Sequence, residues 1–272
     1  MNRGAPAKIN LALVVGPVRV DGKHEIVTIL QRVDLRDEIV LEPSDDGDIV
    51  VDGYREDTLV RDALSALAEE TGAGSGWRVR LDKRIPVAAG LGGGSSDAAA
   101  ALALANDRLA KALGSEQLRA LAGGVGADVP FFLAEGTQLG SGDGSELAPV
   151  TVPLEFAVVL VLPRGERKLS TADAYHRFDE RGGSDGFAAR RAALLEVLEG
   201  VRDPRDLAAL PRNDLASSPL AVELESRGAF RADVSGAGPT VYALFDDVSE
   251  AERAASAVSG IGRTWVVRPV AT

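Results

Sequence analysis

The chain begins with hydrophobic patterns that are typical of β-strands. In residues 7–15 (AKINLALVV), Ile9, Leu11, Leu13 and Val15 fall on one side, which predicts a strand. The valine- and isoleucine-rich runs HEIVTILQRVDL, DEIVLEP and GDIVVDG predict further strands. The alternating run WRVRLDKRIP predicts another, with one apolar and one charged face, as in an antiparallel sheet that is covered on one side.

Helical spacing appears between and after these strands. Apolar residues recur at helical intervals from Thr58 to Gly72, where we expect the helix to end. Residues 96–112 predict a second helix, which we expect to be buried because alanines and leucines cover nearly all of its sides. A third helix is predicted over residues 115–122, followed by two or three short strands within VPFFLAEGTQLGSGDGSELAPV.

The C-terminal part has the pattern of a second structural unit. The apolar run EFAVVLVLP predicts its first strand, and helices are expected around residues 171–180, 186–199 and 218–227. A strand to Ser235, a glycine turn, the strand TVYALFDD, a helix at 249–258 and the strand RTWVVRP complete the chain. This order indicates an α+β architecture, with domains expected at residues 1–152 and 153–272.

Composition narrows the classes of function. The chain has 272 residues, no cysteine, two histidines and a net charge of −11. Without cysteine there are no disulfides, thiolate metal sites or cysteine nucleophiles, and two histidines argue against a multi-histidine metal site. The acidic charge argues against non-specific nucleic-acid binding. Because the sequence has no apolar run of about 18 residues and no signal-peptide core, we expect a cytoplasmic protein without a nucleic-acid or membrane partner.

The stretch GLGGGSSDAAAA (residues 90–101) is a candidate phosphate site. It is not a P-loop, because no lysine lies between Arg84 and Lys111. It does not fit a dinucleotide fingerprint, because the third glycine position is Ser95 and the preceding strand alternates. Small residues that open a helix nevertheless let backbone N–H groups bind an anion, and Ser95 and Ser96 add hydroxyl donors or caps. The alternative is a tight strand-to-helix turn.

The stretch PVAAGLGGGSSDAAAA resembles the P-x-x-x-G-L-G-(G)-S-S-x-A-A loop of the superfamily that includes galactokinase, homoserine kinase, mevalonate kinase and phosphomevalonate kinase. PAKINL and SGAGPTVYALF are similar to the first and third motifs of that superfamily, in the same order. DGKHE, GADVPFF and PRNDL resemble one branch, which phosphorylates the 2-hydroxyl of a CDP-linked methylerythritol in non-mevalonate isoprenoid biosynthesis.

The resemblance implies a two-domain small-molecule kinase fold. Its N-terminal domain would be a β-rich α/β domain with the ATP loop, and its C-terminal domain a ferredoxin-like α+β domain that binds the substrate. It implies ATP and Mg²⁺ as cofactors and a CDP-linked methylerythritol as the small-molecule partner, and leaves monomer and homodimer open. The sequence assigns no metal ligand.

The resemblance also implies roles for single residues. Asp128 would be the catalytic base, although it could instead cap the turn before Pro130. Lys8 would be the second catalytic residue. It shares one side of its strand with Asn10, opposite the apolar row, and that side faces either a cavity or solvent. The ATP loop would comprise Pro86, Val87, Ala88, Ala89, Gly90, Leu91, Gly92, Gly93, Gly94, Ser95 and Ser96.

The candidate substrate contacts match those of the branch only in part. Lys23 stands where the branch has a tyrosine that stacks on cytosine, and His24 matches the histidine that reads the edge of that base. Tyr175 matches the aromatic wall on the other side, although it could be a helix-core tyrosine. A different acceptor alcohol, favoured by Lys23, and a non-catalytic nucleotide-binding protein, disfavoured by Lys8 and Asp128, remain alternatives. The full set comprises Asn10, Lys23, His24, Thr171, Tyr175, Ser235, Gly236 and Gly238.

Overall fold

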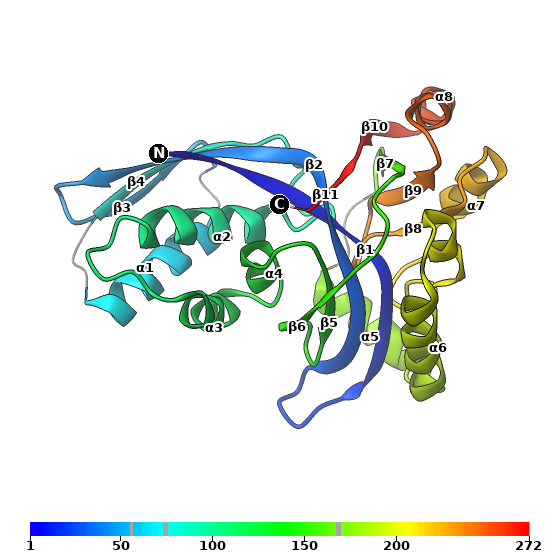
Figure 1. Ribbon diagram of the computed structural model, residues 1–272, viewed down its shortest axis with the longest axis horizontal. Helices are drawn as coiled ribbons and strands as arrows, with labels where there is room; N and C mark the ends of the chain where they lie inside the picture. Colours follow the sequence, from blue (N-terminus) through cyan, green and yellow to red (C-terminus); the bar gives the residue numbers. More distant parts are fainter. Residues whose placement is uncertain (55–56, 73–75, 167–169, 272) are drawn as a thin grey trace. The chain divides into compact units, whose positions relative to one another are not determined.

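The computed structural model describes residues 1–54, 57–72, 76–166 and 170–271 (Figure 1). The contacts divide the chain into two compact units, neither of which is continuous in sequence. Strands β1 (Asn2–Val18) and β2 (His24–Ser44) each run from one unit into the other. Unit 1 comprises Met1–Ala7, Leu35–Val87 and Gly92–Glu135, and unit 2 comprises Lys8–Asp34, Ala88–Leu91 and Gly136–Thr272.

Unit 1 combines strands with a group of helices. The second half of β2 pairs antiparallel with β4 (Gly76–Asp82), which pairs parallel with β3 (Ile49–Asp52). Side chains of β4 are alternately buried and exposed, as its sequence predicts for a sheet covered on one face. The helices lie on one side of these strands (Figure 1): α1 (Leu59–Thr71), α2 (Gly93–Asn106), α3 (Ser115–Val125) and α4 (Val129–Leu133).

Helix α2 is buried on nearly all sides, as expected, but its bounds differ from the predicted 96–112. Residues 96–106 are all buried. The helix starts at Gly93 because Gly92 takes the left-handed conformation before it, with φ of 70°. It ends at Asn106, whose side chain accepts a hydrogen bond from Leu113 N and donates one to Leu113 O. The side chain of Asn106 thus closes the loop that follows and turns the chain away from the helix axis.

The stretch predicted to contain two or three short strands contains two, and it begins with a short helix at Val129 that the sequence did not predict. Its residues VPFF read as an apolar run with β-branched and aromatic side chains, a pattern that short helices and short strands share. Pro130 lies in the first turn of α4, where its missing N–H group costs nothing and its fixed φ suits a helix. Tertiary burial of all four residues then favours this short helix.

In unit 2 the first half of β2 is a central strand. It pairs antiparallel with β5 (Thr137–Ser141) and with β11 (Pro269–Val270), a strand that the sequence did not predict. β5 pairs in turn with β6 (Glu146–Val150), and β1 pairs with β2. From Ala7 to Val15, both faces of β1 are buried, including the side that carries Lys8 and Asn10.

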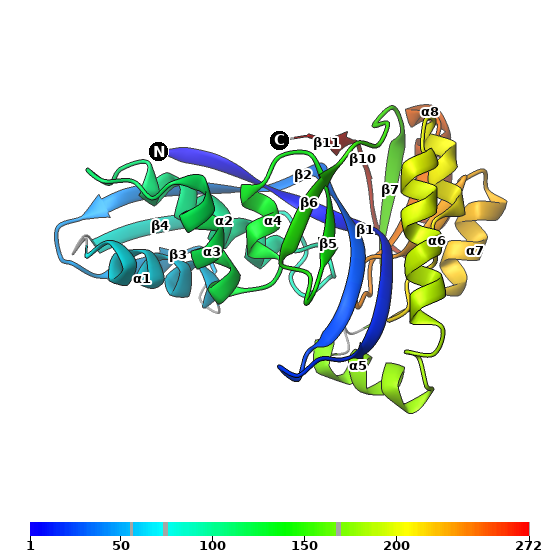
Figure 2. The same cartoon turned by 60° about the horizontal axis from the view of Figure 1, so that its bottom comes forward.

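A second sheet in unit 2 has the order β10-β7-β9-β8 and is antiparallel throughout. Alanines and leucines of α7 and α8 pack with its buried valines into one apolar core. α5 and α6 occur where the sequence predicted them (Figure 2), whereas the short 3₁₀ helix η1 was not predicted. The elements are β7 (Ala157–Pro163), α5 (Thr171–Glu180), α6 (Phe187–Gly200), η1 (Pro204–Ala209), α7 (Pro219–Ser226), β8 (Arg231–Val234), β9 (Val241–Phe245), α8 (Val248–Val258) and β10 (Gly262–Val267).

Candidate active site

Lys8 and Asn10 lie in the interior of unit 2, with only 4% and 5% of their surfaces exposed. Lys8 Nζ donates a hydrogen bond to Asn10 Oδ1 at 2.7 Å. Asn10 Nδ2 donates to Thr28 Oγ1 at 2.8 Å, and that hydroxyl donates to Ala12 O at 2.7 Å. A buried cation is held in place by such polar contacts, because burying it without them costs much free energy. The structure thus resolves the alternative that the sequence left open, since the two side chains face inward.

The glycine turn between β8 and β9 lies beside these two residues. A Cβ atom added at Gly236 would lie 3.5 Å from Asn10 Oδ1 and 3.7 Å from Lys8 Nζ. Ser235 Oγ donates to Gly90 O at 2.9 Å. A Cβ atom at Gly90 would lie only 2.3 Å from Ser235 O, and its φ of +81° is in the left-handed region. Glycine is therefore required at position 90, where the two backbones touch.

Residues 88–91 are held on two sides within unit 2. Lys8 N donates to Leu91 O at 2.9 Å, and Thr240 N donates to Ala89 O at 3.3 Å. Ala88 has a φ of +54° and is the single non-glycine residue with positive φ in the described chain. This conformation costs an alanine about 1–2 kcal/mol. Strain of this kind persists where surrounding contacts fix the backbone, which is common at ligand-binding loops.

In unit 1 the start of α2 has the properties of an anion site. Gly92 is the N-cap residue, and no side chain caps the helix, so the N–H groups of its first turn are left for a ligand. Ser96 is 1% exposed, and its Oγ has no hydrogen-bond partner among the described residues. A buried hydroxyl without a partner is unfavourable unless a ligand or water satisfies it. The residues present therefore fit a bound phosphate.

Lys83 joins two buried carboxylates at the base of this helix. Its Nζ lies 2.5 Å from Asp37 Oδ2 and 2.5 Å from Asp97 Oδ2, and both aspartates are fully buried. Asp37 Oδ1 also accepts from Arg84 N and Ile85 N, at 2.5 Å and 2.8 Å. The cluster thus fixes the chain on both sides of the glycine stretch. Sequence reasoning missed it, although a lone aspartate at position 97 in an alanine-rich helix was an available signal.

Burial raises the pKa of Asp97 to about 7. The Lys83 ammonium lowers that pKa, while the neighbouring Asp37 carboxylate raises it. Burial lowers the pKa of Lys83, but the two carboxylates outweigh it, so that its pKa is raised overall. Asp57, whose Oδ1 accepts from Val60 N at the start of α1, also has a pKa raised by burial. Burial thus makes the Asp97 carboxyl harder to ionise than an ordinary aspartate.

Asp128 is half-buried and occupies the N-cap position of α4, with φ of −83° and ψ of −13°. Its side chain makes no capping hydrogen bond to that helix. The expected cap of the turn before Pro130 is thus not formed by this carboxylate, and the catalytic role of Asp128 stays a prediction. Asp128 belongs to unit 1, whereas Lys8 belongs to unit 2.

His24 and Tyr175 form an aromatic stack within unit 2. Their ring centroids are 4.6 Å apart with an interplanar angle of 16°. The His24 Nε2 atom lies 2.8 Å from Asp179 Oδ1, and the ring of Phe178 meets His24 edge-on. The side chain of His24 is only 8% exposed. Tyr175 thus packs on the predicted base-reading histidine, and it is also partly buried against an apolar cluster that contains Leu13 and Phe178.

Lys23 points to a different neighbour. Its Nζ forms an ion pair with Asp143 in the turn between β5 and β6, and its side chain is 61% exposed. The hydrogen bond from Lys23 lowers the pKa of Asp143 to about 2, and the same bond raises the pKa of Lys23. Thr171 begins α5 and is exposed, and the preceding Ser170 caps that helix by accepting from Asp173 N.

Within unit 2, the structure brings the predicted residues into two groups. One group surrounds Lys8 and contains Asn10, Gly90, Ser235 and Gly236. Gly238 belongs to the same turn, because its N–H group donates to Ser235 O at 3.0 Å. The other group contains His24 and Tyr175, with Lys23 directed toward Asp143. The roles of these residues in binding and catalysis stay predictions.

Two family models match the chain. The GHMP kinases N terminal domain matches residues 58–136, and the GHMP kinases C terminal domain matches residues 220–263. The N-terminal match includes the glycine stretch and Asp128, and the C-terminal match includes the glycine turn. Fold and matched domains together define a GHMP kinase, an ATP-dependent phosphotransferase.

Relatives along the whole chain define the family more closely. A 4-diphosphocytidyl-2-C-methyl-D-erythritol kinase of Leifsonia xyli subsp. xyli is 38% identical over 289 residues, which cover 97% of this chain and 94% of that protein. The protein of the same name from Saccharopolyspora erythraea is 38% identical over 284 residues, covering 97% and 88%. The chain therefore belongs to the family of 4-diphosphocytidyl-2-C-methyl-D-erythritol kinases.

Solved structures agree with this assignment. The crystal structure of a 4-(cytidine 5'-diphospho)-2C-methyl-D-erythritol kinase matches with a TM-score of 0.80 at 32% identity, covering 99% of both chains. The mevalonate kinase of Methanococcus jannaschii matches with a TM-score of 0.78 at 14% identity, which shows a shared fold. The predicted family, fold class and enzyme class are thus confirmed. Within the described parts of the chain, no helix combines the length and apolar content needed to cross a membrane.

Proposed function

We propose that this chain transfers the γ-phosphoryl group of ATP to the 2-hydroxyl of 4-diphosphocytidyl-2-C-methyl-D-erythritol, in non-mevalonate isoprenoid biosynthesis and in the cytoplasm. The observation that carries the proposal is 38% identity over 97% of the chain to kinases named for that substrate. The buried Lys8–Asn10 pair beside a glycine turn supports it with an arrangement suited to an anionic reacting group.

ATP would be held by its phosphates at the start of α2. The uncapped N–H groups after Gly92 and the Ser96 hydroxyl offer hydrogen-bond donors there, and the helix dipole favours negative charge. ATP, when bound, supplies the electrophilic γ-phosphoryl group. Mg²⁺ belongs to the proposal because kinase sites hold it by phosphate oxygens and one or two protein oxygens. Among the described residues, no group of three or more histidines and carboxylates could hold a metal by itself.

Asp128 would act as the base. Its carboxylate would accept the proton of the 2-hydroxyl as that oxygen bonds to the γ-phosphorus, while the bond from the γ-phosphorus to the bridging oxygen breaks and ADP leaves. Lys8 would stabilise the negative charge on the transferred group. Its ammonium is buried, and an ion contact strengthens where water is excluded. Asn10 would orient Lys8 through their 2.7 Å hydrogen bond.

A second candidate function is phosphorylation of a different alcohol. It is favoured by Lys23, which replaces the expected aromatic residue and pairs with Asp143 instead of offering a stacking surface. Lysine can cover a base with its stem, but it supplies no flat ring for stacking.

One assay separates the two functions. ADP release by the purified chain would be measured with ATP and Mg²⁺ against CDP-methylerythritol, mevalonate, homoserine and galactose. We expect turnover with the cytidine substrate alone. Turnover with only an alcohol that lacks the cytidine would contradict the proposal and establish the second function. Tight ATP binding without turnover of any acceptor would indicate a non-catalytic nucleotide-binding protein.

A further inference from the structure

The stretch PRNDL (residues 211–215) has no part in the site described above, yet its side chains reach that site. It forms a loop between η1 and α7, where Asn213 is 8% exposed. Asn213 Nδ2 donates to Val234 O at 2.8 Å and to Gly236 O at 2.7 Å. Its Oδ1 accepts from Leu215 N at 2.8 Å. The whole side-chain amide is therefore engaged, and it ties the loop to the glycine turn.

The two carbonyls that Asn213 binds lie on either side of Ser235. Holding both of them fixes the path of the turn, because neither peptide group can rotate without breaking a hydrogen bond that is buried or partly buried. The same turn places Gly236 beside Lys8 Nζ and Asn10 Oδ1. The position of the turn relative to Lys8 thus depends on a side chain that itself touches neither Lys8 nor Asn10 in the contacts described.

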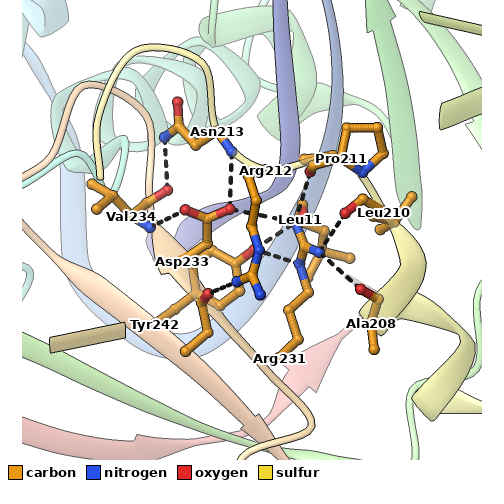
Figure 3. Close-up of polar contacts among 12 residues, drawn as sticks. Leu11, Ala208, Leu210, Pro211, Arg212, Asn213, Arg231, Asp233, Val234 and Tyr242 are labelled. Atoms are coloured by element: carbon orange, nitrogen blue, oxygen red, sulfur yellow. Dashed lines mark hydrogen bonds and ion pairs between the residues drawn. The ribbon is translucent and has the colours of Figure 1, made fainter. Parts of the chain in front are cut away.

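A buried ionic network formed by Asp233 and Arg231 contacts the backbone of Asn213 (Figure 3). Asp233 Oδ2 accepts from Asn213 N at 2.9 Å and lies 3.4 Å from a guanidinium nitrogen of Arg231. Arg231 is 1% exposed and also donates to Leu210 O at 2.7 Å and Pro211 O at 2.8 Å. A buried charge of this kind is tolerated only where its donors are satisfied, and here the backbone of the loop satisfies them. The network therefore locks the loop that carries Asn213.

The network continues to the strand that carries Lys8. Arg231 Nε donates to the hydroxyl of Tyr242 at 3.2 Å, and that hydroxyl donates to Leu11 O at 3.0 Å. Tyr242 is fully buried, and Leu11 directly follows Asn10 in β1. Loop, turn and strand are thus joined by one continuous set of buried hydrogen bonds, which holds a single geometry more strictly than apolar packing does.

We infer that Asn213 is a positioning residue for phosphoryl transfer, which acts by holding the Ser235–Gly238 turn at Lys8 and Asn10. The expected fall in kcat rests on the proposed function, whereas the expected shift of the turn does not. Losing the amide frees two carbonyls of the turn, so that the turn shifts and the reacting groups are misaligned. A displacement of about 1 Å can lower a rate roughly 10²-fold.

The test compares Asn213→Ala and the milder Asn213→Ser with the matched control Asn106→Ala. Asn106 is 5% exposed and likewise brackets a loop, through two hydrogen bonds to the backbone of Leu113. All three variants lose a buried amide, so comparable losses of stability are expected. We expect kcat to fall about 10- to 100-fold in Asn213→Ala, and less in Asn213→Ser, which keeps one donor, while kcat of Asn106→Ala stays within about twofold of wild type.

Hydrogen–deuterium exchange of the folded proteins gives a readout that needs no substrate. Backbone amides of residues 235–240 should exchange faster in both Asn213 variants and at the wild-type rate in Asn106→Ala. Equal kcat in Asn213→Ala and Asn106→Ala, or unchanged exchange of the turn, would overturn the inference. It would also be overturned if both Asn213 variants failed to fold while Asn106→Ala folded, because Asn213 would then serve the fold in general. If the wild-type protein showed no turnover, the proposed function would be refuted. The inference about the turn would still be tested, because hydrogen–deuterium exchange needs no substrate.

Discussion

The ring of Tyr175 stacks on the imidazole of His24, with 4.6 Å between the ring centroids. The stack joins the two residues that the family resemblance assigns to recognition of the base, and Asp179 holds His24 Nε2 at 2.8 Å. Because an ionised carboxylate only accepts hydrogen bonds, the proton of this contact lies on His24 Nε2. Lys23 is next to His24 in sequence and forms an ion pair with Asp143. The turn between β1 and β2 therefore supplies no aromatic ring at position 23 that could stack on a base.

An aromatic ring at position 23 should improve binding of a cytidine substrate. We expect Lys23→Tyr to lower the KM for CDP-methylerythritol about 5- to 100-fold with little change in kcat, because stacking of a base on an aromatic ring contributes about 1–3 kcal/mol. Steady-state kinetics at varied substrate would measure it. Asp143→Asn is the control, since it breaks the same ion pair without adding a ring. A KM that is unchanged or raised in Lys23→Tyr would count against base stacking at this position.

Replacing the proposed base should affect chemistry and spare nucleotide binding. We expect Asp128→Asn to lower kcat by about 10²–10⁴-fold, the range typical of a general base, while the affinity for ATP is kept. The control is Asp62→Asn, which alters an exposed aspartate in the first turn of α1. Single-turnover rates and ATP titrations would separate the two effects. Full activity of Asp128→Asn would remove this residue from the mechanism.

Stability should depend on pH through Asp97. In the unfolded chain this carboxyl loses its proton near its ordinary pKa of 3.8, whereas in the folded protein burial raises that pKa to about 7. Between these values the folded state binds more protons, so the free energy of unfolding falls as pH rises. We expect Asp97→Asn to reduce that fall between pH 5 and pH 7 by on the order of 2 kcal/mol.

Urea unfolding of both proteins at several pH values measures the difference. Asp233, whose pKa burial also raises, is present in both proteins and cancels in the comparison. A carbon-13 titration of the Asp97 carboxyl would provide the pKa directly. Parallel stability curves for wild type and Asp97→Asn would show that this carboxyl does not exchange its proton in that range.

Two glycine substitutions should have opposite effects on stability. Gly90→Ala places a Cβ atom 2.3 Å from Ser235 O at a φ of +81°, and we expect a loss of about 2–4 kcal/mol. Gly124→Ala lies in α3 with no atom within 4 Å of the added Cβ, and we expect a gain of about 0.5–1 kcal/mol. Thermal unfolding of the two variants would check both values. A Gly90→Ala protein as stable as wild type would show that the turn can move away from the loop.

Most elements of the fold could be predicted because their hydrophobic periods are regular. The alternation of apolar and charged residues in β4, and the apolar residues on nearly all sides of α2, match the observed burial. The errors occur where tertiary contacts override a local pattern. Asn106 ends α2 early by binding Leu113, and burial makes the short apolar run after Asp128 a helix. The division into domains at residues 152 and 153 stays a prediction.

Those parts of the candidate site that lie within one local motif could be predicted from the sequence. The glycine stretch before α2 follows from neighbouring residues, and so does the placement of Lys8 and Asn10 on one side of their strand. The sequence left open whether that side faces inward, and the burial of both residues decides it. The Lys83 cluster and the amide of Asn213 were not predictable, because their partners are distant in sequence. Asp37 lies 46 residues from Lys83, and Gly236 lies 23 residues from Asn213. Such pairs are set by the fold, and a lone aspartate such as Asp97 in an alanine-rich helix signals a partner without identifying it.

The pairing of β11 with β2 has a consequence for synthesis on the ribosome. Gln31 Nε2 donates to Val270 O, a residue 239 positions later in the chain, and Gly136 N donates to Ala271 O. At about 5–20 residues per second, translation needs roughly 10 to 50 seconds to deliver that partner. During this interval the apolar hairpin of β1 and β2 has left the ribosome without its last strand. Pairing of this part of the sheet can therefore be completed only after Pro269–Val270 has left the ribosome.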